Sequence, residues 1–166
     1  MAEEFWGRLE FPARLIDDEV REALEREGAE FNGGRLIERR NRVYGPEIYV
    51  ENGIFTLDDQ EASYGMLYDL EQLLRKKGIP LDRQSGQAYD YTPELVIFRP
   101  AQNGTPALDL NLPLFNDEPF ITVQELRELL PQGIQAIRAY LDKEYPTYPP
   151  LGDYVTVHNF LDTVRG

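Results

Sequence analysis

The chain has no cysteine and a single histidine, His158, among its 166 residues. Without cysteine there are no disulfides, no thiolate zinc ligands and no cysteine nucleophile, and a reducing, cytoplasmic location is expected. A single histidine also excludes zinc sites built from several histidines, and it leaves a serine triad only one residue as its base. We therefore predict no cofactor, no essential metal and no catalytic role for His158.

Motifs that mark common enzyme sites are missing as well. The sequence contains no Gly-x-Ser-x-Gly, no P-loop and no Gly-x-Gly-x-x-Gly. Its 30 acidic residues guarantee some neighbouring carboxylates, but no spacing singles out one pair for acid–base chemistry. The sequence therefore favours a non-catalytic protein and leaves an enzyme as the minority alternative.

Positive charge is scarce, because 17 basic against 30 acidic residues give a net charge of −13 at pH 7. Direct binding to nucleic acid or to anionic membranes needs Lys and Arg to neutralise phosphates, so neither is expected. No apolar run approaches the roughly 18 residues that span a bilayer, and the acidic beginning does not resemble a signal peptide. The negative charge either serves solubility or forms a surface that imitates a polyanion.

Residues 48–99 show the clearest pattern of strands and helices. Asn52-Gly53 joins two β-rich runs and is a strong hairpin signal. A helix is predicted from near Ser63 to Gly78, because its leucines recur at helical spacing. A polar loop or an extended hairpin tip over 82–91 and a further apolar strand complete this stretch.

The beginning of the chain repeats this pattern. A strand is predicted over 5–16, in which Pro12 marks a sheet edge or a bulge. A helix then begins at Asp17 or Asp18 and stops at Gly28, as the second helix stops at Gly78. The resulting order is that of a ferredoxin-like split β-α-β unit. We predict an α+β fold, with an antiparallel sheet and two helices on one face.

Residues 1–100 are thus expected to form an α+β sheet domain, and 101–166 a proline-rich crossing with a mainly helical C-terminal part packed on the same domain. Leucines at every second position over 108–114 allow a short added strand within the crossing. The last stretch, 154–164, fits both a helix and a strand, and the helix is favoured.

Two helices are predicted within this C-terminal part. Thr122 and Glu125 form a capping box, which opens the first helix, and Pro131 ends it. The second helix is predicted from Gly133 to about Glu144, with Ile134, Ile137 and Leu141 on one face.

Tyrosines are interleaved with acidic residues from Tyr64 to Glu94. A tyrosine has a rigid apolar ring with a polar tip and suits recognition surfaces, although an ordinary strand covered by tyrosines is the simpler interpretation. The carboxylates at 58–61 have the chemistry of a Ca²⁺ or Mg²⁺ site but lack the spacing of an EF-hand, so capping of the next helix explains them more simply. The candidate partner-binding residues are Asp58, Asp59, Glu61, Tyr64, Asp82, Tyr89, Asp90, Tyr91 and Glu94.

These observations favour an acidic, non-catalytic interaction protein that binds another protein. A narrower hypothesis is an inhibitor that imitates nucleic acid, of the phage or mobile-element counter-defence type, and occupies the site of a basic nucleic-acid-binding protein. The alternative is a small-molecule-binding domain or enzyme that uses carboxylates and tyrosines at the sheet end, among them Asp58, Asp82 and Tyr89. The sequence does not determine the oligomeric state.

Overall fold

The structure, a computed structural model, describes residues 4–40, 44–63, 66–86 and 92–155. Its strands are β1 (Glu4–Pro12), β2 (Phe31–Asn32), β3 (Arg35–Leu36), β4 (Glu47–Glu51), β5 (Ile54–Ser63), β6 (Leu81–Ser85), β7 (Glu94–Arg99), β8 (Leu108–Phe115) and β9 (Glu118–Pro119). The α-helices are α1 (Asp18–Arg26), α2 (Met66–Lys76), α3 (Val123–Leu129) and α4 (Ile134–Glu144), and the short 3₁₀ helices are η1 (Ala13–Leu15), η2 (Leu130–Gln132) and η3 (Leu151–Tyr154).

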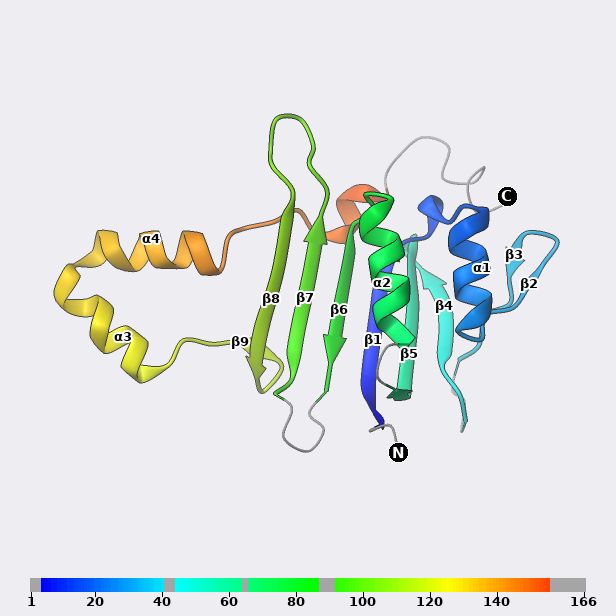
Figure 1. Cartoon of the computed structure of the whole chain (residues 1–166), viewed down its shortest axis with the longest axis horizontal. Helices are drawn as coiled ribbons and strands as arrows, with labels where there is room; N and C mark the ends of the chain where they lie inside the picture. The colour runs from blue at the N-terminus through cyan, green and yellow to red at the C-terminus, as the bar shows by residue number, and fades with distance from the viewer. Residues whose placement is uncertain (1–3, 41–43, 64–65, 87–91, 156–166) are drawn as a thin grey trace.

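Seven strands form the main sheet in the order β4-β5-β1-β6-β7-β8-β9, and every pairing between them is antiparallel. Helices α1 and α2 lie on one face of this sheet, and α3 and α4 extend beyond its β8 edge (Figure 1). The predicted α+β fold, with an antiparallel sheet and two helices on one face, is confirmed.

The first two helices begin and end largely as predicted. Asp17 caps α1, because its side chain accepts a hydrogen bond from the Val20 backbone N–H at 2.9 Å. Gly28 and Gly78 follow α1 and α2 with φ values of +99° and +68°, a conformation that costs glycine little.

The Asn52-Gly53 hairpin is confirmed, but the strand that follows it is longer than predicted. Asn52 and Gly53 both have positive φ, as a type I′ turn requires, and they join β4 to β5. β5 continues to Ser63, so Asp58, Asp59 and Glu61 lie within a strand and not ahead of a helix. β5 is this long because β1 provides hydrogen-bonding partners for it almost throughout its length.

β1 is a central strand that lies between β5 and β6. Its pairing with β6 ends at Glu10, however, so Pro12, the last residue of β1, pairs on one side only, with Ile54 of β5, in agreement with the predicted edge position. β5 and β6, which α2 connects, both pair with β1 and so form a split unit around it. The finer ferredoxin-like description stays a prediction.

The core lies between this sheet and its two covering helices. Leu9, Phe11 and Phe55 come from the strands, and Leu24 and Leu74 from the helices; each is at most 2% exposed. The Phe11 and Phe55 ring centroids are 4.9 Å apart. Burial of such apolar side chains is the main stabilising contribution to a domain of this kind.

The sheet extends further toward the C-terminus than the sequence indicated. Asp82 lies in β6, within the stretch predicted as a polar loop or an extended hairpin tip, and β6 pairs with β7 as a hairpin does. Asp82 and its strand neighbour Arg83 form ion pairs with Arg99 and Glu71. β8 is an eight-residue strand paired along its length with β7, not merely a short addition to a crossing. Its alternating leucines place Leu112 and Leu114 in buried positions.

Two helices follow β9, as predicted, and the chain then returns to the sheet. Thr122 is the N-cap of α3, and α4 spans Ile134–Glu144. The chain passes behind β8 and β7 to η3 (Figure 1), where Leu151 and Tyr154 are buried. Of the ambiguous stretch 154–164, residues from 156 onward lie outside the described residues. The division into domains at residue 100 stays a prediction, and no helix among the described residues has the length and apolar content to cross a membrane.

Candidate functional site

Five of the nine predicted partner-binding residues are described, and they lie on different faces of the sheet. Tyr64, Tyr89, Asp90 and Tyr91 fall outside the described residues, as does His158. Asp58 and Asp82 belong to the face that points away from α1 and α2, which we call the far face. Asp59 and Glu94 belong to the helix-covered face, and Glu61 lies in the same strand as Asp59.

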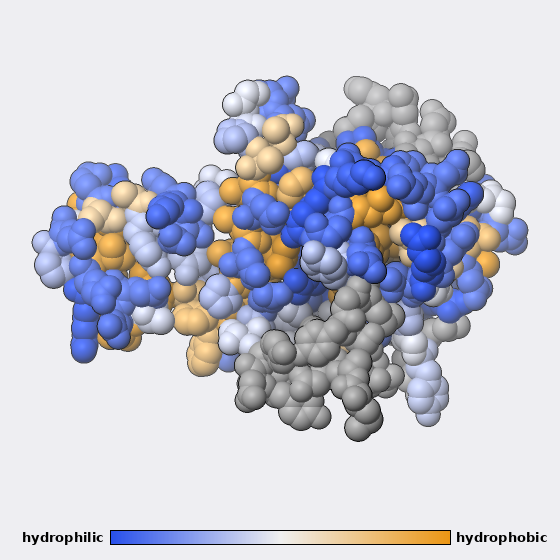
Figure 2. Space-filling model, in the orientation of Figure 1, coloured by the Kyte–Doolittle hydropathy of each residue, from blue (hydrophilic) through white to orange (hydrophobic). Residues whose placement is uncertain are grey.

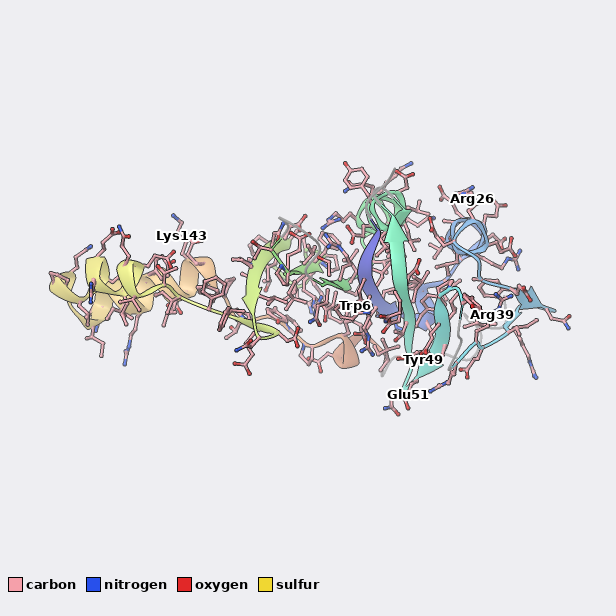
Figure 3. The ribbon with its side chains drawn as sticks, turned by 90° about the horizontal axis from the view of Figure 1, so that it is seen from below. Trp6, Arg26, Arg39, Tyr49, Glu51 and Lys143 are labelled. Carbon is pink, nitrogen blue, oxygen red and sulfur yellow. The ribbon has the colours of Figure 1, made fainter. Side chains whose placement is uncertain are left out.

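On the far face, the strand register brings Asp58 and Asp82 close to Glu10 of β1. Asp58 accepts a hydrogen bond from the indole Nε1–H of Trp6 at 2.7 Å, and Figure 3 shows Trp6 on the side opposite α2. Asp82 Oδ1 accepts from Arg99 at 2.8 Å. Burial raises the pKa of Asp82 and of Glu10, more than their arginine partners lower it. These carboxylates already have internal partners and are not presented as a free acidic stripe.

On the helix-covered face, Glu94 takes part in an ion-pair network around Arg83. Arg83 donates to Glu94 at 2.7 Å, to Ser85 Oγ at 3.0 Å, and to Glu71 of α2. The Glu71 and Arg83 side chains are only 5% and 15% exposed. This network ties α2 to β6 and β7, so we assign Glu94 a structural role.

A second group of acids lies where α1 and α2 meet. A pocket of about 550 Å³ there is lined by residues that include Glu27, Asp69 and Arg26. Burial raises the pKa of Glu27, and the nearby carboxylates Asp59 and Asp69 raise it further. Within the described part of the chain, however, no group of three or more Asp, Glu or His residues is placed to hold a metal ion.

The most unusual surface of the described chain is the segment from Phe115 to Tyr145, which we call the arm. It comprises β9, α3, η2 and α4, and it projects from the β8 edge of the sheet (Figure 1). Neither α3 nor α4 contains a buried residue. Helices of a folded domain normally bury one apolar face, so an arm that buries none has an unsatisfied surface.

Large apolar side chains are exposed mainly on this arm. We call the described residues outside the arm the body. Among the exposed large hydrophobic side chains of the described residues, the body contributes only Ile37, Tyr44 and Tyr68. The arm contributes Phe115, Phe120, Val123, Leu126, Leu130, Ile134 and Leu141. Val123, Leu130 and Ile134 are 67%, 58% and 66% exposed. On the face seen in Figure 2, the arm shows small hydrophobic areas between hydrophilic residues. Apolar patches with polar borders commonly mark binding sites.

Polar contacts hold the two arm helices in a defined arrangement. The Thr122 hydroxyl accepts from the Glu125 N–H at 3.1 Å while the Glu125 carboxylate accepts from the Thr122 N–H at 2.7 Å, the reciprocal pattern of a capping box. Those Thr122 hydrogen bonds lower the pKa of Glu125. Tyr140 of α4 donates to Glu125 of α3, and Tyr145 donates to the Phe120 carbonyl at 2.6 Å. The arm is thus an ordered helical hairpin.

The charge of the arm follows that of the whole chain. It contains six acidic residues against three basic ones, the acidic ones being Asp117, Glu118, Glu125, Glu128, Asp142 and Glu144. Apart from Glu125, which is partly buried, these acids are exposed, and they lie in the same segment as the exposed apolar side chains. Such a patch favours a partner surface that is apolar at its centre and basic at its margin.

The arm as a binding surface was missed at the level of sequence. The apolar stripe of Ile134, Ile137 and Leu141 was recognised, and an amphipathic stripe predicts that something covers it. Whether the cover is the same chain or another protein depends on the path of the backbone, which no local pattern specifies. Comparison of the chain with protein-family models, with curated proteins and with solved structures finds no match to any of them.

Proposed function

We propose that this chain is a non-catalytic protein-binding module whose arm docks on a basic partner protein. The observation that carries the proposal is the exposure of seven large apolar side chains on the arm, whose two helices contain no buried residue among those described. In water such a surface is costly, and its burial in a partner would be favourable by about 25 cal/mol per Å². A reducing, cytoplasmic setting, suggested by the absence of cysteine, is part of the proposal.

The charge of the chain indicates which kind of partner fits. Two copies would each carry a net charge of −13, so self-association through the acid-rimmed arm works against electrostatic repulsion. A protein with a basic margin around an apolar groove would instead gain complementary charge and a faster encounter. We therefore assign the arm to a different protein and not to a second copy.

Imitation of nucleic acid is a narrower version of the same proposal. Its support is the charge excess of the chain, together with the exposed acids of the arm. Asp58, Asp82 and Glu94, in contrast, have internal donors, so the mimic version depends on the arm acids more than on those of the sheet. An experiment in which DNA competes for the partner protein distinguishes nucleic-acid imitation from plain protein docking.

The test compares three tagged forms of the chain in pull-downs from the native host. The arm variant carries Leu130→Ser and Ile134→Ser, and the matched control carries Ile37→Ser and Tyr68→Ser, which are also exposed but lie on the body. We expect a basic protein to bind the wild type and the control. With the purified partner, the arm variant should lose about 100-fold or more in affinity, since central apolar contacts dominate such interfaces.

The same binding is then measured at increasing salt concentration and in the presence of DNA. Binding should weaken as salt rises, because the acidic margin contributes attraction that ions screen. Displacement by DNA would support the mimic version, and its absence would leave the plain docking module. Equal binding by the arm variant and the control, or formation of a stable homodimer in light scattering, would overturn the assignment to a basic partner. Circular dichroism should confirm that all three forms are folded.

A further inference from the structure

A second site lies apart from the arm, at the end of the sheet where β7 and β8 are joined. A pocket of about 410 Å³ separates the β7–β8 connection from the connector that leads from α4 to η3. This volume lies within the range of small-molecule sites. The pocket shares no residue with the arm and is independent of the proposed protein contact.

Proline and tyrosine side chains form a large part of the pocket wall. Pro100 and Pro106 come from the β7–β8 connection, and Pro146, Pro149 and Tyr148 come from the connector. Proline and tyrosine present rigid faces, so little conformational entropy is lost when a ligand packs against them. A wall of this kind suits a flat ring.

One buried cation also lines the pocket. Arg99 is 3% exposed, and its Nε donates to the Pro149 carbonyl at 2.7 Å. Its Nη1 lies within hydrogen-bonding distance of Asp82, Leu81 O and Phe98 O. Its Nη2, although buried, has no hydrogen-bond partner. A buried guanidinium nitrogen without an acceptor is unfavourable, so an acceptor supplied from the pocket would be stabilising.

The position of Tyr148 shows how a ligand reaches that nitrogen. The Arg99 guanidinium lies over the Tyr148 ring, with 5.2 Å between Cζ and the ring centroid. Tyr148 is only partly buried and belongs to a connector that is neither helix nor strand. A small shift of this ring would open a path from the pocket to Arg99 Nη2, and the ring would then be placed to stack on a bound molecule.

The charges around Arg99 restrict the ligand class. Asp82 already forms an ion pair with Arg99, and the whole chain is strongly negative. A second full negative charge would therefore be repelled, whereas a neutral oxygen acceptor would not. We propose that this pocket binds a small, neutral aromatic or heterocyclic molecule through a carbonyl oxygen that accepts from Arg99 Nη2.

The test uses two probes that differ in the carbonyl group, acetophenone and toluene, titrated into the full ¹⁵N-labelled chain. We expect both to bind weakly, with dissociation constants on the order of millimolar, as is usual for fragments. Acetophenone should shift the amide signals of Arg99, Ala107, Leu108 and Tyr148, and it should bind roughly tenfold more tightly than toluene.

Two variants identify the site. Ala107→Trp fills the pocket from an exposed position and should abolish the shifts without affecting the fold. The pair Arg99→Met with Asp82→Leu removes both charges together, so that neither is left buried alone, and should remove the preference for acetophenone. Absence of shifts at the lining residues, equal affinity for the two probes, or unchanged binding by Ala107→Trp would each overturn the proposal.

Discussion

The body and the arm of this protein use apolar side chains in opposite ways. In the body, residues such as Phe55 and Leu24 are fully buried between the sheet and its helices. In the arm, the apolar side chains of Val123 and Ile134 are more than 60% exposed. The same side-chain chemistry thus stabilises the fold in one region and offers a binding surface in the other.

This difference also separates stability from function along the chain. Most of the ion pairs of the body connect elements of the fold to one another, as Arg83 does between α2 and β7. In the arm, the polar contacts of Glu125 and Tyr145 stay within the arm itself. Substitutions in the arm should therefore leave the body intact, and substitutions in the body should lower the stability of the whole molecule.

The largest expected effect comes from a matched pair of substitutions, one in each region. Phe55→Ala leaves a cavity against Phe11 and should lower the free energy of unfolding by about 3–5 kcal/mol. Ile134→Ala removes an exposed side chain and should change it by less than about 0.5 kcal/mol. Urea unfolding followed by circular dichroism measures both values. A comparable loss in Ile134→Ala would show that the arm packs on the body in solution.

A smaller effect on stability is expected from a change in pH, and it differs between the body and the arm. Burial raises the pKa of Glu27 above its usual value of 4.5, and Asp59 and Asp69 raise it further against the weaker opposing effect of Arg26. In the same way, burial raises the pKa of Glu10, and Asp82 and Asp58 add to this while Arg8 opposes it. The folded chain therefore binds protons more tightly than the unfolded chain at these two sites.

The sign follows from linkage. Stability is lost as pH rises through a raised carboxyl pKa, so the body should become more stable as pH falls from 7 to about 5. The lowered pKa of Glu125 in the arm acts only below its usual value of 4.5, where acid weakens the helix cap. Thermal unfolding at the two pH values measures the effect on the body. Glu27→Gln, as the control, should raise stability at neutral pH and reduce the pH dependence.

Local patterns in the sequence predicted much of the body. The Asn52-Gly53 turn and the two glycine helix stops are signals carried by a few adjacent residues, and they hold in the structure. The errors arose where a long-range partner decided the outcome. β5 extends through Asp58 and Asp59 because it pairs with β1. Asp82 lies in a strand, where its side chain accepts a hydrogen bond from Arg99.

The candidate sites were harder to predict for the same reason. The acidic residues were predicted to act as one group. Their hydrogen-bond donors, such as Trp6 for Asp58, lie far away in the sequence. The arm is exposed because none of the described elements covers its helices, and the Arg99 pocket depends on two distant segments that meet. Neither condition leaves a periodic signal in the sequence.

The smallest expected effect is local to the arm. Thr122→Ala removes the hydroxyl that accepts from the Glu125 N–H and should cost the α3 helix about 1 kcal/mol. Because the arm contributes little to the body, the midpoint of global unfolding should hardly move. Hydrogen exchange should instead become about fivefold faster for the amides of α3, while the amides of β1 and β5 exchange as before. Thr122→Ser, which keeps the hydroxyl, serves as the control. If exchange in α3 is unchanged by Thr122→Ala, the cap does not hold the arm; if β1 and β5 are also accelerated, the arm and the body unfold as one unit and the contrast between them fails.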